Sequence, residues 1–92
     1  MLNQLVLVGR IKEIKEDKNI VLAVSRAYKN EEGIYETDLI PIVLSDKLFD
    51  NAKEFCQVND VIGVKVRLET KDNNIIIIAE RLTLLSNRKS EK

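Results

Sequence analysis

The sequence contains no histidine, and its only cysteine is Cys56. The absence of histidine removes the commonest general base and, together with the scarcity of cysteine, most kinds of metal site. A single cysteine also excludes a disulfide within the chain. Cys56 follows Phe55 at the apolar end of an expected helix, so we interpret it as a small buried hydrophobic residue and not as a nucleophile.

Motifs of enzymes and of membrane proteins are also missing. The sequence has no glycine-rich phosphate loop, no nucleophile elbow and no paired histidine or cysteine motif, so we expect no catalysis, no cofactor and no metal. No apolar run is longer than Ile75–Ala79, which has the length of a strand and is far too short to span a membrane. No apolar signal segment follows a basic start, and we expect a cytoplasmic protein without membrane association.

Charge of one sign is not in excess either, because fifteen lysines and arginines balance fifteen acidic residues. The chain therefore lacks the broad positive field of a strongly basic nucleic-acid binder, and any site for a polyanion must come from local sorting of charge. With 45% hydrophobic and 33% charged residues over 92 positions, the composition is that of one folded domain with a single core.

The stretch Asn19–Lys29 is the most informative segment that is present. Its first half, Ile20–Val24, is apolar at consecutive positions and rich in β-branched residues. Because successive side chains of a strand point to opposite faces, this pattern predicts a strand that is covered on both sides. Its second half turns basic and aromatic and leads into a turn-prone loop at 30–33.

The other elements follow from hydrophobic spacing. Apolar residues at alternate positions predict four further strands, and a Ser45-Asp46 N-cap followed by helical spacing predicts a short helix over Leu48–Cys56. We expect Leu48, Ala52 and Phe55 on its inner face. The four further strands are expected at Leu2–Ile14, Tyr35–Leu44, Val61–Thr70 and Ile75–Leu85.

Three strands, one helix and two strands is the order of the oligonucleotide-binding fold (OB-fold). We therefore predict an all-β protein, a five-stranded Greek-key barrel with one short α-helix between strands 3 and 4. Small SH3-like barrels are the main alternative, but they do not have a full helix at that point. The domain is expected to span residues 1–85, followed by a frayed polar tail at 86–92. The predicted core comprises Val8, Leu22, Val24, Ile42, Val64 and Leu68.

Two residues are expected to interrupt regular strand pairing. Gly9 lies inside the first strand, at a position where a strand bends or lets another backbone approach closely. Pro41 lies inside the third strand and cannot donate a backbone hydrogen bond, so we expect an unpaired edge or a bulge there.

More apolar side chains are present than one barrel of this size needs to bury. Such surplus commonly marks an interface, so we predict a homodimer or a homotetramer in which the N-terminal strand pairs or packs across a two-fold axis. The predicted interface residues are Leu5, Val6, Leu7, Val8, Leu39 and Val43.

In its motifs and in the order of its elements, the chain resembles the bacterial single-stranded DNA-binding protein family. The opening MLNQLVLVGRI is similar to the characteristic start of that family, and LAVSR at Leu22–Arg26 is close to the usual form of its second strand. Thr37–Lys47 and the helix resemble the third strand and its helix, and Val58–Thr70 resembles the fourth strand. The resemblance covers nearly the whole chain from Met1 to Leu85 and implies an OB-fold that binds single-stranded DNA.

The resemblance also implies which residues would contact DNA. This family stacks bases on aromatic side chains above a cationic groove. Tyr28 falls on one such position, where it would either stack on a base or cap the core. Leu39, Ser45 and Asn73 fall where the other aromatics are expected, which implies weaker stacking than in a full family member. The predicted nucleic-acid contacts are Arg10, Lys12, Arg26, Tyr28, Lys29, Tyr35, Lys65, Arg67 and Lys71.

Acidic residues limit where this groove can lie. Glu31, Glu32, Glu36 and Asp38 make the hairpin after the second strand acidic, so we expect phosphates to be bound on the sheet and not at the hairpin tip. The predicted function is sequence-tolerant binding of single-stranded DNA in replication, recombination or repair. The alternative is a protein–protein interaction module of the replication machinery. A related branch, the primosomal accessory proteins, keeps this fold as a dimer and acts partly by touching other replication proteins.

Overall fold

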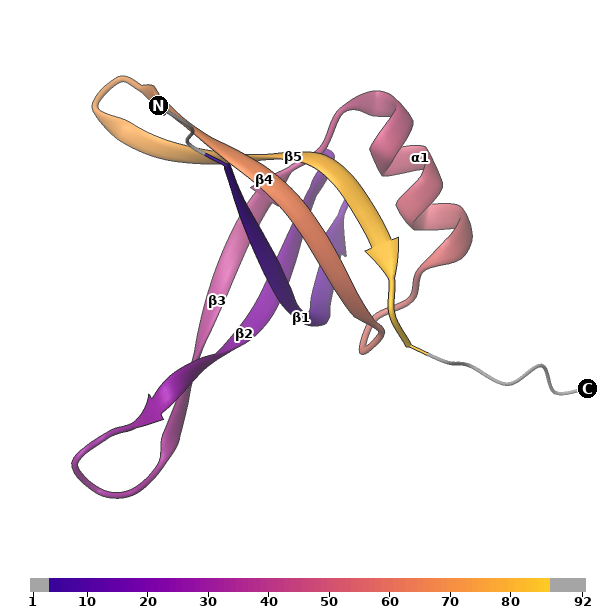
Figure 1. Ribbon diagram of the computed structural model, residues 1–92. Coiled ribbons are helices and arrows are strands. Elements are labelled where there is room, and N and C mark those ends of the chain that lie inside the picture. Colours follow the sequence, from indigo (N-terminus) through magenta and orange to yellow (C-terminus); the bar gives the residue numbers. More distant parts are fainter. Residues whose placement is uncertain (1–3, 87–92) are drawn as a thin grey trace, which may run out of the picture.

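The computed structural model describes residues 4–86, and the strands within them close into a barrel in the order β1-β2-β3-β5-β4 (Figure 1). The elements are β1 (Gln4–Lys15), β2 (Asn19–Lys29), β3 (Tyr35–Val43), α1 (Asp46–Phe55), β4 (Val61–Lys71) and β5 (Asn74–Leu84). This confirms the predicted all-β OB-fold barrel with one helix between its third and fourth strands. The expected start of the first strand at Leu2 and the tail residues 87–92 lie outside the described residues.

β1 belongs to both halves of the barrel. It pairs with β4 over residues 4–10 and with β2 from Arg10 onwards. The change of partner falls beside Gly9, where a β-carbon would lie only 2.3 Å from the carbonyl oxygen of Ala23. The expected close approach of another backbone at Gly9 is therefore confirmed. The edge of β1 that faces away from β4 has no strand partner over residues 4–9 in the described part of the chain.

The barrel closes weakly between β3 and β5. These two strands run parallel and are in register only at Val43 and Ile78. Pro41 pairs with Val21 of β2. On the opposite edge of β3, Pro41 has no partner among the residues that the structure describes. The unpaired edge predicted from the missing N–H of Pro41 is confirmed.

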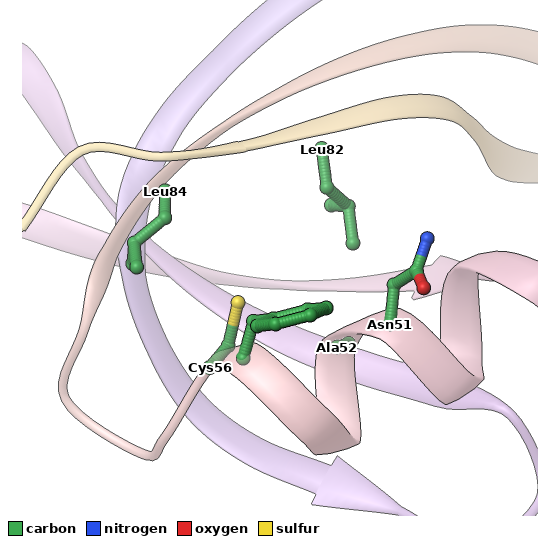
Figure 2. Close-up of a pocket in the computed structure, with 6 residues that line it drawn as sticks. Asn51, Ala52, Cys56, Leu82 and Leu84 are labelled. Atoms are coloured by element: carbon green, nitrogen blue, oxygen red, sulfur yellow. The ribbon is translucent and has the colours of Figure 1, made fainter.

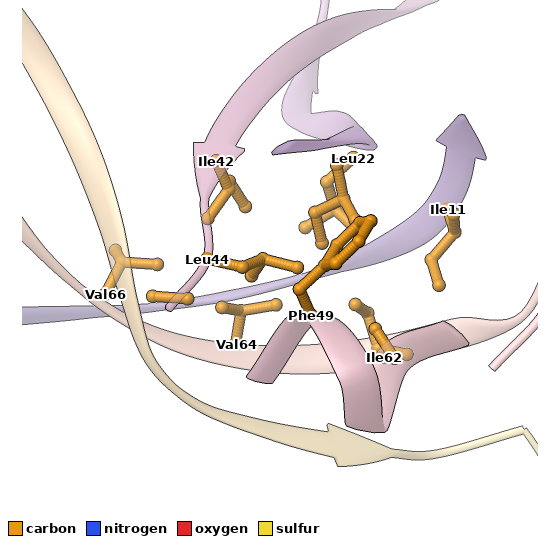
Figure 3. Close-up of a cluster of buried hydrophobic side chains, with 11 residues drawn as sticks. Ile11, Leu22, Ile42, Leu44, Phe49, Ile62, Val64 and Val66 are labelled. Carbon is orange, nitrogen blue, oxygen red and sulfur yellow. The ribbon is translucent and has the colours of Figure 1, made fainter. Parts of the chain in front are cut away.

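Buried hydrophobic side chains from every element fill the barrel (Figure 3). They are Ile11, Ile20, Leu22, Ile42, Leu44, Phe49, Ala52, Ile62, Val64, Val66 and Ala79. The predicted burial of Leu22, Ile42 and Val64 is confirmed, whereas Val24 and Leu68 are only half-buried. The prediction that Val8 is buried was wrong, because its side chain is 52% exposed. Its neighbour Leu7 packs toward the core, and alternation along the strand therefore turns Val8 outward.

Ser45 caps the helix as predicted, but the helix begins at Asp46, two residues before the predicted Leu48, and its inner face differs from the expected one. The Ser45 hydroxyl accepts a hydrogen bond of 3.2 Å from the amide of Leu48, which confirms the N-cap. Phe49 and Ala52 are buried, whereas Phe55 is 57% exposed, so the prediction that Phe55 belongs to the core was wrong. Phe55 is the last helical residue, and it lines a shallow apolar pocket between α1 and β5 in place of the barrel interior (Figure 2).

The end of the described chain is held against the barrel. The Ser86 amide donates to the carbonyl oxygen of Val61, and the Ser86 hydroxyl accepts from the amide of Val61. The sequence suggested that the frayed tail begins at Ser86. In the structure Ser86 is held in place, because these two hydrogen bonds continue the pairing of β5 with β4.

Residues 4–86 include no helix that is long and apolar enough to cross a membrane. No group of three or more metal-ligating side chains converges in the same range.

Candidate nucleic-acid interface

The distal halves of β2 and β3 form a hairpin that projects from the barrel (Figure 1). We call residues 25–38 the arm. Its turn is well organised, because the side-chain oxygen of Asn30 accepts hydrogen bonds of 2.9 and 3.0 Å from the amides of Glu32 and Ile34. Gly33 has a φ of 79°, a conformation that glycine adopts without steric cost. The arm therefore presents its side chains on an ordered backbone.

Both tyrosines of the sequence lie on the arm. The Tyr28 side chain is 84% exposed, so it does not cap the core, and its ring is available for stacking. Tyr35 is also exposed and is in register with Lys29. The ammonium group of Lys29 lies 5.6 Å from the centroid of the Tyr35 ring, within the range of a cation–π contact.

Arg26, also on the arm, is occupied by two carboxylates. Its Nε and Nη2 donate hydrogen bonds of 3.1 and 3.0 Å to the two oxygens of Asp38, and Nη1 lies 2.9 Å from Oε1 of Glu36. Hydrogen bonding to Arg26 lowers the pKa of Asp38, and the same bond raises the pKa of the guanidinium. The structure thus places this predicted phosphate contact beside two negative charges.

A second surface lies on the outer side of β1, β4 and β5. We call it the outer face; it is a shallow depression lined by Val6, Val8, Gly63, Lys65, Arg81, Thr83 and Leu85. Lys65 is in register with Val6 on one side and with Arg81 on the other. Neither Lys65 nor Arg81 has an acidic partner among the described residues. Sequence analysis missed Arg81, and the signal that could have found it is its alternation with Leu82 and Leu84 on β5.

Arg67 follows Lys65 on the same side of β4, but its charge is neutralised locally. Its Nε donates a 2.8 Å hydrogen bond to Glu69, and Nη1 donates one of 3.2 Å to Glu80. These bonds raise the pKa of Arg67, with that to Glu69 contributing most. Gln4 also donates to Glu80, so this end of the outer face is a closed polar cluster.

Arg10 and Val8 connect the two surfaces. Val8 lines both the outer face and a second depression, which also contains Arg10, Ser25 and Thr37. Arg10 donates a 3.0 Å hydrogen bond from Nη1 to the carbonyl oxygen of Asn59, which leaves its charge uncompensated by a carboxylate. The remaining two predicted contacts, Lys12 and Lys71, are exposed and have no acidic partner in the described range.

Leu39, Ser45 and Asn73 occupy the three positions where the resemblance implies aromatic rings. Leu39 is an exposed apolar residue on β3. Ser45 caps α1, and Asn73 adopts a φ of 68° in the β4–β5 turn, a region that asparagine tolerates better than an aromatic residue. Tyr28 is therefore the one predicted stacking position that carries a ring.

Five of the six predicted interface residues are exposed. They are Leu5, Val6, Val8, Leu39 and Val43. Leu7 is the exception, because it is half-buried and packs against the core. Leu5, Val6 and Val8 lie along the unpaired edge of β1.

Comparison with known proteins gives a consistent result. Residues 2–75 match the single-strand binding protein family. The chain is 31% identical over 80 residues to single-stranded DNA-binding protein B of Bacillus subtilis (strain 168), covering 77% of this chain and 71% of that protein. It is 36% identical over 81 residues to single-stranded DNA-binding protein 2 of Staphylococcus aureus (strain Mu50), covering 78% of this chain but only 57% of that protein.

Solved structures show the same fold. The mitochondrial single-stranded DNA-binding protein of S. cerevisiae superposes with a TM-score of 0.75 at 16% identity and covers 96% of this chain and 99% of its own. A single-stranded DNA-binding protein from Plasmodium falciparum, solved in complex with single-stranded DNA, gives a TM-score of 0.69 at 21% identity, with coverages of 94% and 96%. The dimeric N-terminal domain of PriB from Thermoanaerobacter tencongensis gives 0.62 at 19% identity, with coverages of 92% and 98%.

Proposed function

This chain belongs to the single-strand binding protein family, and on that premise we propose that it binds single-stranded DNA without catalysis and without sequence preference. The observation that carries the proposal is a surface that runs from Ser25 at the base of the arm, past Arg10, to Lys65 on the outer face. The same arm carries the exposed ring of Tyr28. The proposed setting is DNA replication, recombination or repair in the bacterial cytoplasm.

The geometry supports a mechanism with little stacking and mostly electrostatic contact. Tyr28 offers a π-face to any base, which makes stacking sequence-tolerant. The cations without acidic partners would follow the phosphates, and each such contact releases counterions from the strand. We assign this role to Arg10, Lys12, Lys65, Lys71 and Arg81. Lys29 and Tyr35 would add a charged, aromatic contact on the arm.

Titration of a long labelled dT oligonucleotide by fluorescence anisotropy tests the proposal. We expect binding at about 50 mM salt that weakens markedly at about 200 mM, because phosphate contacts dominate. Absence of binding at the lower salt would contradict it. The chain would then be better explained as an interaction module of the replication machinery, as the missing aromatic rings at Leu39, Ser45 and Asn73 would allow.

The two cations of β4 should contribute unequally. Lys65→Ala should flatten the dependence of log affinity on log salt by about 0.7, the value for one phosphate contact on a single strand. Arg67→Ala should change the slope much less, since Glu69 and Glu80 already neutralise Arg67. Anisotropy titrations across the same salt range measure both slopes. A larger effect from Arg67 than from Lys65 would show that the DNA follows a different path.

We further propose that the chain forms a homodimer through the unpaired edge of β1. Within residues 4–86 no strand pairs with that edge over residues 4–9, and these six residues include no proline or charged side chain that would oppose pairing with another strand. Antiparallel pairing of two such edges would leave the outer face open, because strands pair in the plane of the sheet. A homotetramer would require a second contact between such dimers.

Sedimentation at micromolar concentration tests this assembly. Wild type should sediment as a dimer or larger, and Val6→Glu should shift it toward the monomer, because an edge charge opposes strand pairing. Ile34→Glu is the matched control, since it adds the same charge at an exposed apolar position on the arm. A monomeric wild type would rule out the proposed dimer.

A further inference from the structure

Arg26 differs from the other exposed cations of the surface proposed for DNA binding. Two of the five N–H groups of its guanidinium donate to Asp38, and its Nη1 lies 2.9 Å from a carboxylate oxygen of Glu36. One positive and two negative charges give this cluster a net charge of −1. Lys65 and Arg81 on the outer face have no such partners within residues 4–86. A phosphate that approaches Arg26, a predicted phosphate contact, therefore meets a cluster with a net negative charge.

The cluster is held in place more firmly than an ordinary surface ion pair. The contact of Arg26 with Asp38 is bidentate, which fixes the plane of the guanidinium. Glu36 is anchored on both sides, because Oε1 faces Arg26 and Oε2 accepts a 3.0 Å hydrogen bond from the side chain of Asn30. Asn30 in turn organises the turn of the arm. The two carboxylates are thus ordered parts of the arm.

The cluster nevertheless remains within reach of a ligand. The side chains of Arg26, Glu36 and Asp38 are each about half exposed, at 54%, 45% and 46%. Tyr28 follows Arg26 by two residues on β2 and is the exposed stacking candidate. A strand that stacks on Tyr28 would therefore pass close to the cluster.

We propose that Glu36 and Asp38 act as an intrinsic competitor of the DNA backbone, occupying Arg26 and thereby limiting how tightly the arm holds single-stranded DNA. This inference rests on the proposed function. It makes the two acids affinity-limiting residues of the site: removing their charges should create a phosphate contact that the wild-type protein lacks.

The size of the effect follows from counterion release. One additional phosphate contact on a single strand steepens the log–log salt slope by about 0.7. If the variant and wild type bind equally at 1 M salt, that change in slope corresponds to an affinity gain of about eightfold at 50 mM salt and about threefold at 200 mM. Exposed ion pairs stabilise folds little, so neutralising the two acids should leave the barrel folded.

The test compares Glu36→Gln/Asp38→Asn with Glu16→Gln/Asp46→Asn. Both double variants remove two negative charges, and the control acids are also ion-paired, with Lys53 and Lys18. The control positions flank the other end of β2, away from the arm. Affinity for a long labelled dT oligonucleotide is measured at both salt concentrations, and circular dichroism confirms that each variant is folded. The single variant Glu36→Gln serves if the arm double variant does not fold.

We expect the arm variant to bind about eightfold more tightly at about 50 mM salt and to exceed any gain of the control. In an Arg26→Gln background the same two substitutions should gain no more than the control does. An arm variant that gains no more than the control, or that binds more weakly, would overturn the inference while the proposed function stands. If neither wild type nor the arm variant binds, the proposed function itself fails and the inference falls with it.

Discussion

Replacing Gly9 by alanine is expected to lower the free energy of unfolding by about 3 kcal/mol, at the upper end of the usual cost of overpacking. The new β-carbon would lie 2.3 Å from the carbonyl oxygen and 3.0 Å from the carbonyl carbon of Ala23. Both are backbone atoms of β2 that cannot rotate away. To relieve the clash, β1 and β2 would have to separate where β1 changes partner, and their pairing would be disturbed.

Thermal unfolding followed by circular dichroism measures this effect. For a domain of this size a loss of about 3 kcal/mol lowers Tm by roughly 12–24 °C. Gly63→Ala is the matched control, because a β-carbon there would meet only Leu85 Cδ1 at 3.5 Å, an ordinary contact. Gly63→Ala should leave Tm unchanged or raise it, since glycine weakens a strand interior. Equal effects of the two substitutions would show that the close approach at Gly9 does not determine stability.

Tyr28→Ala is expected to produce the largest loss of DNA affinity of any single surface substitution. Stacking of one base on an aromatic ring contributes about 1–3 kcal/mol, so affinity should fall by about one to two decades. Tyr28 is the one stacking position that has kept its ring, and the exposure of this ring means that no core contact is lost with it. Because every base has a π-face, the loss should be similar for dT and dA oligonucleotides.

Two comparisons make this result specific. Tyr28→Phe keeps the ring and should bind nearly as tightly as wild type. The salt slope should stay the same in both variants, since neither removes a charge. A Tyr28→Ala protein that binds like wild type would exclude stacking at this position.

Local periodicity in the sequence was sufficient to predict the elements. The consecutive apolar residues Ile20–Val24 predicted a strand covered on both sides, and in the structure each of them is at least half-buried. Alternation along Val61–Thr70 predicted β4, and the burial of Val64 within it was predicted correctly; Ser45 predicted the N-cap of α1. These features depend on neighbours within a few residues, which is why they could be read without a structure.

The orientation of single side chains at the ends of elements required the tertiary structure. Phe49 and Phe55 both lie on α1, and only the position of the helix on the barrel sends Phe49 into the core and Phe55 toward β5. Val8 is similar, because the partner strands of β1 decide which of its two faces is covered.

Charge pairing was the part of the candidate site that the sequence could not reveal. Arg26 and Arg67 look like free cations in the sequence, but the β2–β3 register brings Asp38 and Glu36 to Arg26, and the β4–β5 pairing brings Glu80 to Arg67. The same register places Arg81 beside Lys65 and leaves both without an acid in the described chain. The sequence by itself therefore determined the barrel and its helix, because these follow from local patterns, whereas the exposure of Tyr28 was decided by the structure. Only the tertiary structure decided which cations remain available, because a cross-strand partner depends on register between segments far apart in the chain.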